Sequence, residues 1–271
     1  MTMAADPHAP SRPGSAPWIE RQAVQILQAR GHHAWLLQGP SGLGQIDLAF
    51  VLAASWLCES AQPSSPLACG RCASCNAIRA RAHPDLRVLL PELMLIDRDW
   101  PLGDKAQAEI DQKKRKPSRE IRVDAMRDTI EFTQRTSARG RGLVVVVAPA
   151  ERMNAITANA LLKTLEEPPG NTRFVLASDA PHALLPTVRS RCRFHAMQWP
   201  AQDESVAWLG GLPQWPGGDP AVWMRAAGGR PGDALELASA GAKLEWKTLP
   251  RALAAGSAMP VSYTHLARRC A

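Results

Sequence analysis

The sequence has few aromatic residues and no long apolar run. Phe, Trp and Tyr make up 5% of its 271 residues, with a single tyrosine. The longest uninterrupted apolar stretch, residues 143–150, is far shorter than the ~20 residues that a membrane-spanning helix needs. The N-terminal residues lack the basic stretch followed by an apolar core that marks a secretory signal. These absences predict a soluble, cytoplasmic protein without a membrane partner.

Cysteine is also scarce, and neither sign of charge dominates strongly. Six cysteines in a chain of this length are too few for a disulfide-stapled scaffold, yet four of them crowd into residues 58–75. Lys and Arg number 32 against 25 Asp and Glu, which gives a formal charge of +7. This excess favours a polyanionic partner such as DNA without requiring one. The apolar fraction of 45% is typical of a globular protein of roughly two domains.

Alternating apolar patterns predict an α/β domain over residues 17–196, after a proline-rich, disordered lead-in over 1–16. Strands alternate with helices along this region, which is typical of a parallel sheet. The predicted strands are 34–37, 86–90, 142–148 and 173–177, and the predicted helices are 18–30, 46–57, 123–135 and 156–166.

Two further stretches depart from that alternation. Residues 91–118 are long, polar and end in a basic run, which predicts a flexible surface insertion or, as an alternative, a DNA-contacting arm. After Trp199 the composition shifts, and helical patterns near 204–209, 221–227 and 233–238 predict a small helical domain over 197–240.

A glycine-rich loop joins the first strand to the second helix. Gly39, Gly42 and Gly44 have the spacing of a Walker A loop, whose backbone N–H groups cradle phosphates. The motif should continue with a lysine for the phosphates and a Ser or Thr for magnesium, but Gln45 and Ile46 stand there. We therefore expect no tight ATP binding and regard the loop as vestigial.

The strand over 143–147 occupies the place of a Walker B strand, which should end in an acidic pair. It ends instead in Ala148 and Pro149, and Glu151 could replace the missing carboxylates only through a shifted register. An unrelated α/β domain with an accidental glycine-rich turn remains open on these two motifs alone.

Three ordered motifs resolve that ambiguity: NALLKTLEEPP at 159–169, RFVLAS at 173–178 and LPTVRSRC at 185–192. They closely resemble the same succession of motifs in bacterial clamp-loader subunits, and with the degenerate loop they look most like the delta-prime family of the DNA polymerase III clamp loader. The resemblance covers about residues 17–237. It implies an AAA+ fold with a P-loop-type parallel sheet, a helical lid and a C-terminal helical collar.

The resemblance also implies a role. Delta-prime subunits do not turn over ATP themselves but help load a sliding clamp onto primed DNA, as partners of gamma or tau and delta subunits. Arg191 matches the arginine that such a subunit presents in trans to a neighbour's ATP. A guanidinium suits that task because it is permanently charged and offers several N–H donors to phosphate oxygens. The alternative for Arg191 is an intrachain salt bridge. The position that corresponds to a second sensor arginine holds Gly232.

The cysteines suggest a structural metal site. Cys58, Cys69, Cys72 and Cys75 offer four thiolates with two short turns, a set that suits tetrahedral zinc with no catalytic water, and the resembling family carries the same cluster. Free thiols are the alternative, and His83 is a possible substitute ligand. Zinc is expected to fold the module over 58–75.

The last region, 241–271, is shorter than a full collar, so we expect a truncated collar segment, with residues 261–271 as a possible non-native tail. The preferred function is thus a non-catalytic clamp-loader subunit within a polymerase complex. The alternatives are a working gamma- or tau-like AAA+ ATPase and a zinc-dependent DNA-binding module.

Overall fold

A five-stranded parallel sheet forms the centre of the chain. The computed structural model describes residues 15–29 and 31–241. The strands lie in the order β2-β3-β4-β1-β5, and every neighbouring pair is parallel. Their bounds are β1 Ala34–Gln38, β2 Leu86–Leu89, β3 Leu143–Val147, β4 Thr172–Ser178 and β5 Arg193–Ala196. This confirms the predicted parallel α/β class. The sequence missed β5, a short and largely exposed edge strand without an apolar run.

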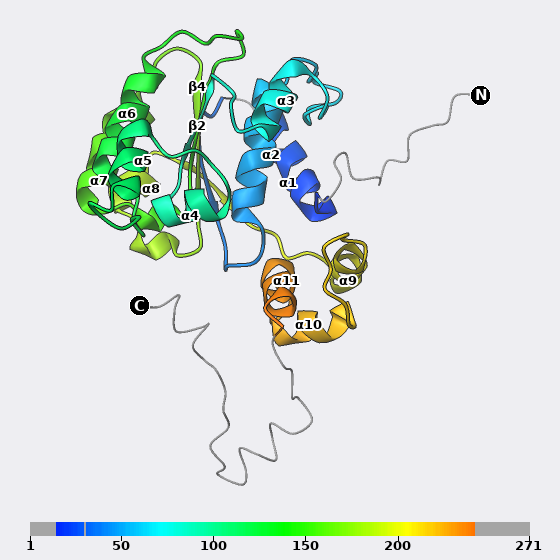
Figure 1. Cartoon of the computed structure of the whole chain (residues 1–271). Helices are drawn as coiled ribbons and strands as arrows, with labels where there is room; N and C mark the ends of the chain where they lie inside the picture. Colours follow the sequence, from blue (N-terminus) through cyan, green and yellow to red (C-terminus); the bar gives the residue numbers. More distant parts are fainter. Residues whose placement is uncertain (1–14, 30, 242–271) are drawn as a thin grey trace.

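Helices cover both faces of the sheet, as Figure 1 shows with α1 and α2 on one side and α6 and α7 on the other. Apolar side chains of the first pair, such as Ile19 and Leu52, join one buried cluster. Those of the second pair, such as Met126 and Leu161, join another. The helices of this domain are α1 Pro17–Gln28, α2 Gln45–Leu57, α3 Ala73–Arg79, α4 Glu92–Asp97, α5 Asp104–Asp111, α6 Val123–Thr133, η1 Ala150–Arg152, α7 Ala155–Glu166, η2 Pro181–Ala183 and α8 Pro186–Arg189.

The stretch 91–118, predicted as a flexible surface insertion, contains two helices, α4 and α5. Arg115, from the basic run, holds this insertion together instead of pointing at a partner. Its Nε donates to Glu109 at 2.7 Å and its Nη2 to Glu92 at 2.8 Å. The backbone N–H of Ser118 also donates to Glu92, at 2.8 Å. One of the four consecutive cations is therefore a structural ion-pair centre.

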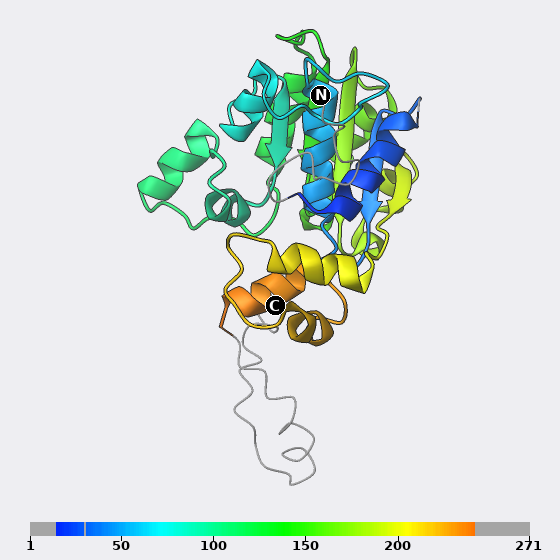
Figure 2. The ribbon, with the colours of Figure 1, turned by 90° about the vertical axis from the view of Figure 1, so that its right-hand side faces the viewer.

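Three helices form the smaller domain: α9 Gln202–Gly210, α10 Pro220–Ala226 and α11 Pro231–Ser239. They enclose their own apolar core around Leu209, Met224 and Ala234. Figure 2 shows these helices directly below the α/β domain. Arg21 of α1 and Glu204 of α9 form a salt bridge, and the rings of Trp18 and Trp208 meet edge to face with centroids 5.1 Å apart.

Within the described ranges, no helix combines the length and the apolar character needed to cross a lipid bilayer. Residues 1–14 of the predicted lead-in and 242–271 of the predicted collar segment lie outside the described residues.

Candidate functional site

The glycine-rich loop lies between β1 and α2, where a P-loop would, but its central side chain faces inward. Gln45 is 3% exposed and its amide donates to the carbonyl oxygens of Gly39 at 2.5 Å and Pro40 at 2.8 Å. Ile46 packs against the apolar cluster beneath α1. The residue that replaces the phosphate-binding lysine is thus a neutral brace of the loop itself.

The first turn of α11 rests on the same loop. The backbone N–H of Gly232 donates to the carbonyl oxygen of Gly42 at 2.9 Å. A Cβ on Gly42 would lie 2.5 Å from the Asp233 carboxylate, so this anionic group sits against the loop backbone. Ser41 Oγ donates to Asp233 at 3.4 Å, and Arg230 forms a salt bridge with it at 2.8 Å. A carboxylate of the chain itself therefore lies against Gly42 of the glycine-rich loop.

A cleft of about 990 Å³ opens beside this contact, between α1, the loop, the β3 and β4 ends and the helical domain. Two cations line it, Arg98 and Arg152. The acidic residues that line it are Asp47, Glu151, Asp179, Asp233 and Glu236. Among the described residues that line the cleft, carboxylates outnumber cations, so these side chains do not provide the concentrated positive charge that binding of a triphosphate needs.

The carboxyl end of β3 supplies no magnesium ligand of its own. All five residues of β3 are buried, and the strand runs into Ala148 and a cis peptide bond to Pro149. Glu151 lies beyond them in η1, lines the cleft and accepts the backbone N–H of Asp179 at 3.3 Å. The segment after β3 therefore brings the Glu151 carboxylate to the cleft, but Gln45 and Ile46 supply no lysine or hydroxyl to complete a magnesium nucleotide site.

Arg191 lies just after α8, more than 20 residues from the end of α7 in sequence but beside it in space. Its Nε and Nη2 both donate to Oε2 of Glu166, at 3.1 and 2.9 Å, and its Nη1 donates to the carbonyl oxygen of Thr187 at 3.0 Å. The intrachain salt bridge that the sequence left open for Arg191 is therefore present. The side chain keeps 29% of its surface exposed.

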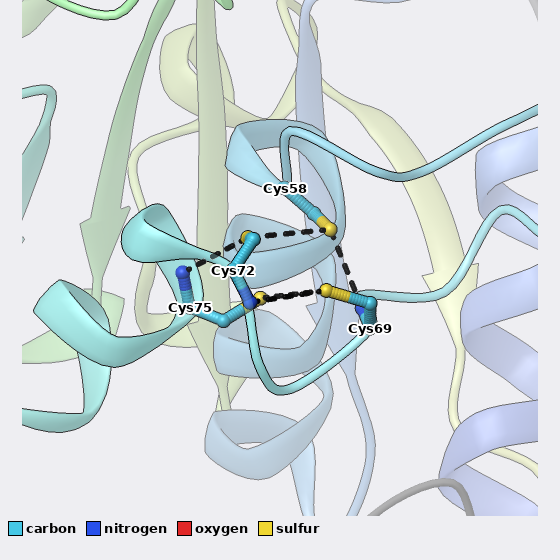
Figure 3. A group of neighbouring side chains, drawn as sticks. All are labelled: Cys58, Cys69, Cys72 and Cys75. Carbon is cyan, nitrogen blue, oxygen red and sulfur yellow. Dashed lines mark hydrogen bonds between the residues drawn. The ribbon is translucent and has the colours of Figure 1, made fainter.

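The four cysteines of the predicted metal site come together (Figure 3). Cys58 caps the end of α2, Cys72 caps the start of α3, and all four Sγ atoms lie within 4.8 Å of one another. Cys58 and Cys72 Sγ are 3.9 Å apart, and Cys69 and Cys75 Sγ are 4.0 Å apart. Four sulfurs about 2.3 Å from a tetrahedral zinc would be ~3.8 Å apart, so the set fits such an ion.

Backbone groups and burial prepare these thiols unequally. The pKa of Cys69 is lowered to about 6, because the backbone N–H groups of Arg71 and Cys72 donate to its sulfur. Burial, reinforced by a hydrogen bond with Cys72, raises the pKa of Cys75 to about 12. A divalent cation among the sulfurs would stabilise a buried Cys75 thiolate, because its positive charge would offset the solvation that the thiolate loses on burial.

His83, the possible substitute ligand, lies outside the cluster. Its Nδ1 accepts the backbone N–H of Asp85 at 3.0 Å, and burial lowers its pKa. Asp85 in turn accepts the backbone N–H groups of Ala138 and Arg139, at 2.7 and 2.9 Å. His83 thus belongs to a turn that leads into β2.

Sequence reasoning missed two features of these sites. One is the contact of Gly232 and Asp233 with the glycine-rich loop, which joins residues about 190 positions apart and leaves no local pattern. The other is Glu166, the partner of Arg191. Its only sequence signal was its place at the end of a helix within the NALLKTLEEPP motif.

The comparisons with known proteins agree with the motifs. A family model described as "DNA polymerase III, delta subunit" matches residues 17–200. The DNA polymerase III subunit delta' of Pseudomonas aeruginosa is 38% identical over 84% of this chain and 62% of its own length. That of Escherichia coli is 34% identical over 82% of this chain and 60% of its own.

Among solved structures, a DNA polymerase III gamma subunit-related protein from Thermotoga maritima aligns with a TM-score of 0.44 at 18% identity. That alignment covers 87% of this chain and 66% of the other. The chain spans about three fifths of the length of the two delta' relatives. The chain belongs to the DNA polymerase III delta-subunit family that the matching model describes, and these curated relatives carry the name delta-prime.

Proposed function

We propose that this chain is a non-catalytic, delta-prime-type subunit of a DNA polymerase III clamp loader. In this role it assembles with gamma or tau and delta subunits and helps load a sliding clamp onto primed DNA. The family match over 17–200 supports the assignment to the complex. A replication role also implies a cytoplasmic location.

The observation that carries the non-catalytic part is the changed chemistry of the glycine-rich loop. The neutral Gln45 is hydrogen-bonded to the loop from inside, and the Asp233 carboxylate lies against Gly42. Gln45 stands at the position of the phosphate-binding lysine and Ile46 at that of the metal-binding Ser or Thr, so the chain is not expected to bind or cleave magnesium ATP by itself. A gamma- or tau-like ATPase is the competing function, and Glu151 at the cleft is the residue that favours it.

Arg191 supplies the chain's contribution to ATP turnover in this proposal. It meets the triphosphate of a neighbouring subunit, where its charge stabilises the transition state. Such an arginine supplied in trans raises turnover by roughly 10³ to 10⁵ in well-studied GTPases. A subunit without an active site can therefore control one.

Zinc is the metal that we propose for Cys58, Cys69, Cys72 and Cys75. Four thiolates leave no position for water, so the ion has a structural role and ties the end of α2 to the start of α3. Glu59, which accepts from Ser74 at 2.9 Å and from Arg139 at 2.8 Å, fastens the module to the loop before β3.

Two measurements on the full chain test this proposal. The first is a titration with magnesium ATP together with a phosphate-release assay. The proposal predicts neither micromolar affinity nor turnover, and turnover by the isolated chain would favour the ATPase alternative. The second is co-assembly with gamma or tau and delta subunits in size-exclusion chromatography. Failure to enter that complex would remove the assignment as a clamp-loader subunit for this chain.

A further inference from the structure

The salt bridge of Arg191 has a geometry suited to holding a guanidinium ready for a second ligand. A guanidinium carries five N–H groups. Three of them are used, by Glu166 Oε2 and by the Thr187 carbonyl oxygen. Among the described residues, the other two have no acceptor. The group is thus fixed on one side and still able to donate.

We propose that Glu166 is a positioning residue that holds Arg191 in the orientation in which it meets a neighbour's triphosphate. This inference rests on the proposed function of Arg191. A free arginine side chain samples many rotamers, and fixing it in one of them costs conformational entropy. Glu166 fixes the side chain before ATP arrives, so less of that entropy is lost in the transition state.

Stability alone does not account for this pair. The Glu166 side chain is 60% exposed, and an exposed ion pair adds little to the stability of the fold. Glu166 is moreover the last residue of α7, where the helix dipole disfavours a negative charge. A carboxylate at an unfavourable helix end, paired with the one arginine that matches the finger motif, indicates a role in directing that arginine.

Arg191 can bind a triphosphate while it is paired with the Glu166 carboxylate. Glu166 offsets one positive charge at a single oxygen, whereas a triphosphate presents several anionic oxygens to the two remaining N–H groups. Glu166 therefore orients the guanidinium without competing for the donors that the phosphate needs. The opposite possibility, that Glu166 sequesters Arg191 and restrains turnover, predicts a gain of activity when Glu166 is removed.

Turnover of the reconstituted clamp-loader complex separates these cases. Arg191→Ala removes the contribution of the guanidinium to kcat. We expect Glu166→Ala to reduce that contribution by on the order of 10- to 100-fold, because the catalytic group is misplaced, and to leave KM for ATP little changed. Glu166→Gln should retain more of that activity, because its amide oxygen can still accept. Glu167→Ala is the matched control, since Glu167 is the next residue and is also exposed, and it should leave kcat unchanged.

A double mutant shows whether Glu166 acts through Arg191. In an Arg191→Ala background, Glu166→Ala should cause no further loss, because its only effect is on the missing guanidinium. A further loss, or a gain of turnover in Glu166→Ala alone, would overturn the inference. If Arg191→Ala lowers turnover and Glu166→Ala does not, the inference fails while the proposed function stands. If Arg191→Ala itself leaves turnover unchanged, the proposed role of Arg191 at a neighbour's triphosphate is wrong.

A measurement on the free chain tests the positioning step independently of assembly. The ¹⁵Nε–H order parameter of Arg191 should be high, close to the backbone value. It should fall in Glu166→Ala, fall less in Glu166→Gln, and stay high in Glu167→Ala. An Arg191 signal as mobile as that of Arg127, which is 66% exposed, would overturn the inference whether or not the complex forms.

Discussion

The contact between Gly42 and the first turn of α11 can be broken by one methyl group. In Gly42→Ala, the new Cβ would lie 2.5 Å from Asp233 Oδ1 and 2.9 Å from the Asp233 backbone nitrogen, closer than real Cβ atoms come to other atoms. The side chain could rotate away, but the backbone nitrogen could not. The helical domain must therefore move off the loop, which removes the hydrogen bond from Gly232 to Gly42.

The stability lost with the Gly232–Gly42 hydrogen bond can be separated from the cost of placing an alanine at a positive φ. Gly42 has φ +81°, and an alanine there costs roughly 1–2 kcal/mol from φ alone. Gly140 has φ +69° with nothing within 4 Å of an added Cβ, so Gly140→Ala pays only this backbone cost. The lost hydrogen bond adds about 1 kcal/mol to the cost of Gly42→Ala, which corresponds to a roughly fivefold larger equilibrium constant for opening of the helical domain.

Hydrogen exchange of the Gly232 amide and of α11 measures the opening of the helical domain. Equilibrium unfolding in urea measures the change in the free energy of unfolding. Gly42→Ala should expose the Gly232 amide and speed exchange in α11, while Gly140→Ala should leave both protected. Equal protection in the two variants would mean that the helical domain does not rest on the loop. The contact that holds Asp233 against Gly42 would then not persist in solution.

Three further predictions concern the other sites. Gln45→Lys alone should leave the isolated chain without micromolar affinity for magnesium ATP in calorimetry, because Ile46 still stands where the metal ligand belongs and Asp233 still presents a carboxylate to the loop; tight binding would show that Gln45 alone disables the loop. The purified chain should contain about one zinc ion, lose it in Cys72→Ser and keep it in Cys192→Ala, whose thiol is buried away from the cluster; metal analysis that finds equal zinc in both variants would refute the four-cysteine site. Burial raises the pKa of Glu92, but hydrogen bonds from Arg115 and Ser118 outweigh it, so the net pKa lies below the ordinary 4.5; the stabilisation is present above about pH 4.5 and is lost as the pH falls through the lowered value. Glu92→Gln should lower the free energy of unfolding at pH 7 by about 1.5–3 kcal/mol and flatten its fall in acid, and an unchanged acid profile would contradict the role of Arg115.

The sequence predicted the parts of the molecule that depend on local patterns. Apolar runs located β3 and β4, and the glycine spacing placed the loop between β1 and α2. The cysteine cluster was also predictable, because short spacings force Cys69, Cys72 and Cys75 together.

The sequence could not predict the contacts that depend on the tertiary fold. The edge strand β5 forms because Trp35 to Gln38 offer it a parallel partner, although its own residues are largely exposed and form no apolar run. In the sequence Arg115 looked like part of a basic surface run. Its partner Glu92 could not be identified, because it precedes Arg115 by 23 residues. The same holds for Glu166 beside Arg191 and for Gly232 on Gly42, since no period in the sequence encodes either contact.

The most direct test of the central claim is ATP turnover by a clamp-loader complex assembled from gamma or tau, delta and this chain. The account predicts that Arg191→Ala lowers turnover while the complex elutes at an unchanged size, and that the chain alone releases no phosphate. Unchanged turnover with Arg191→Ala in a fully assembled complex, or ATP cleavage by the isolated chain, would contradict it.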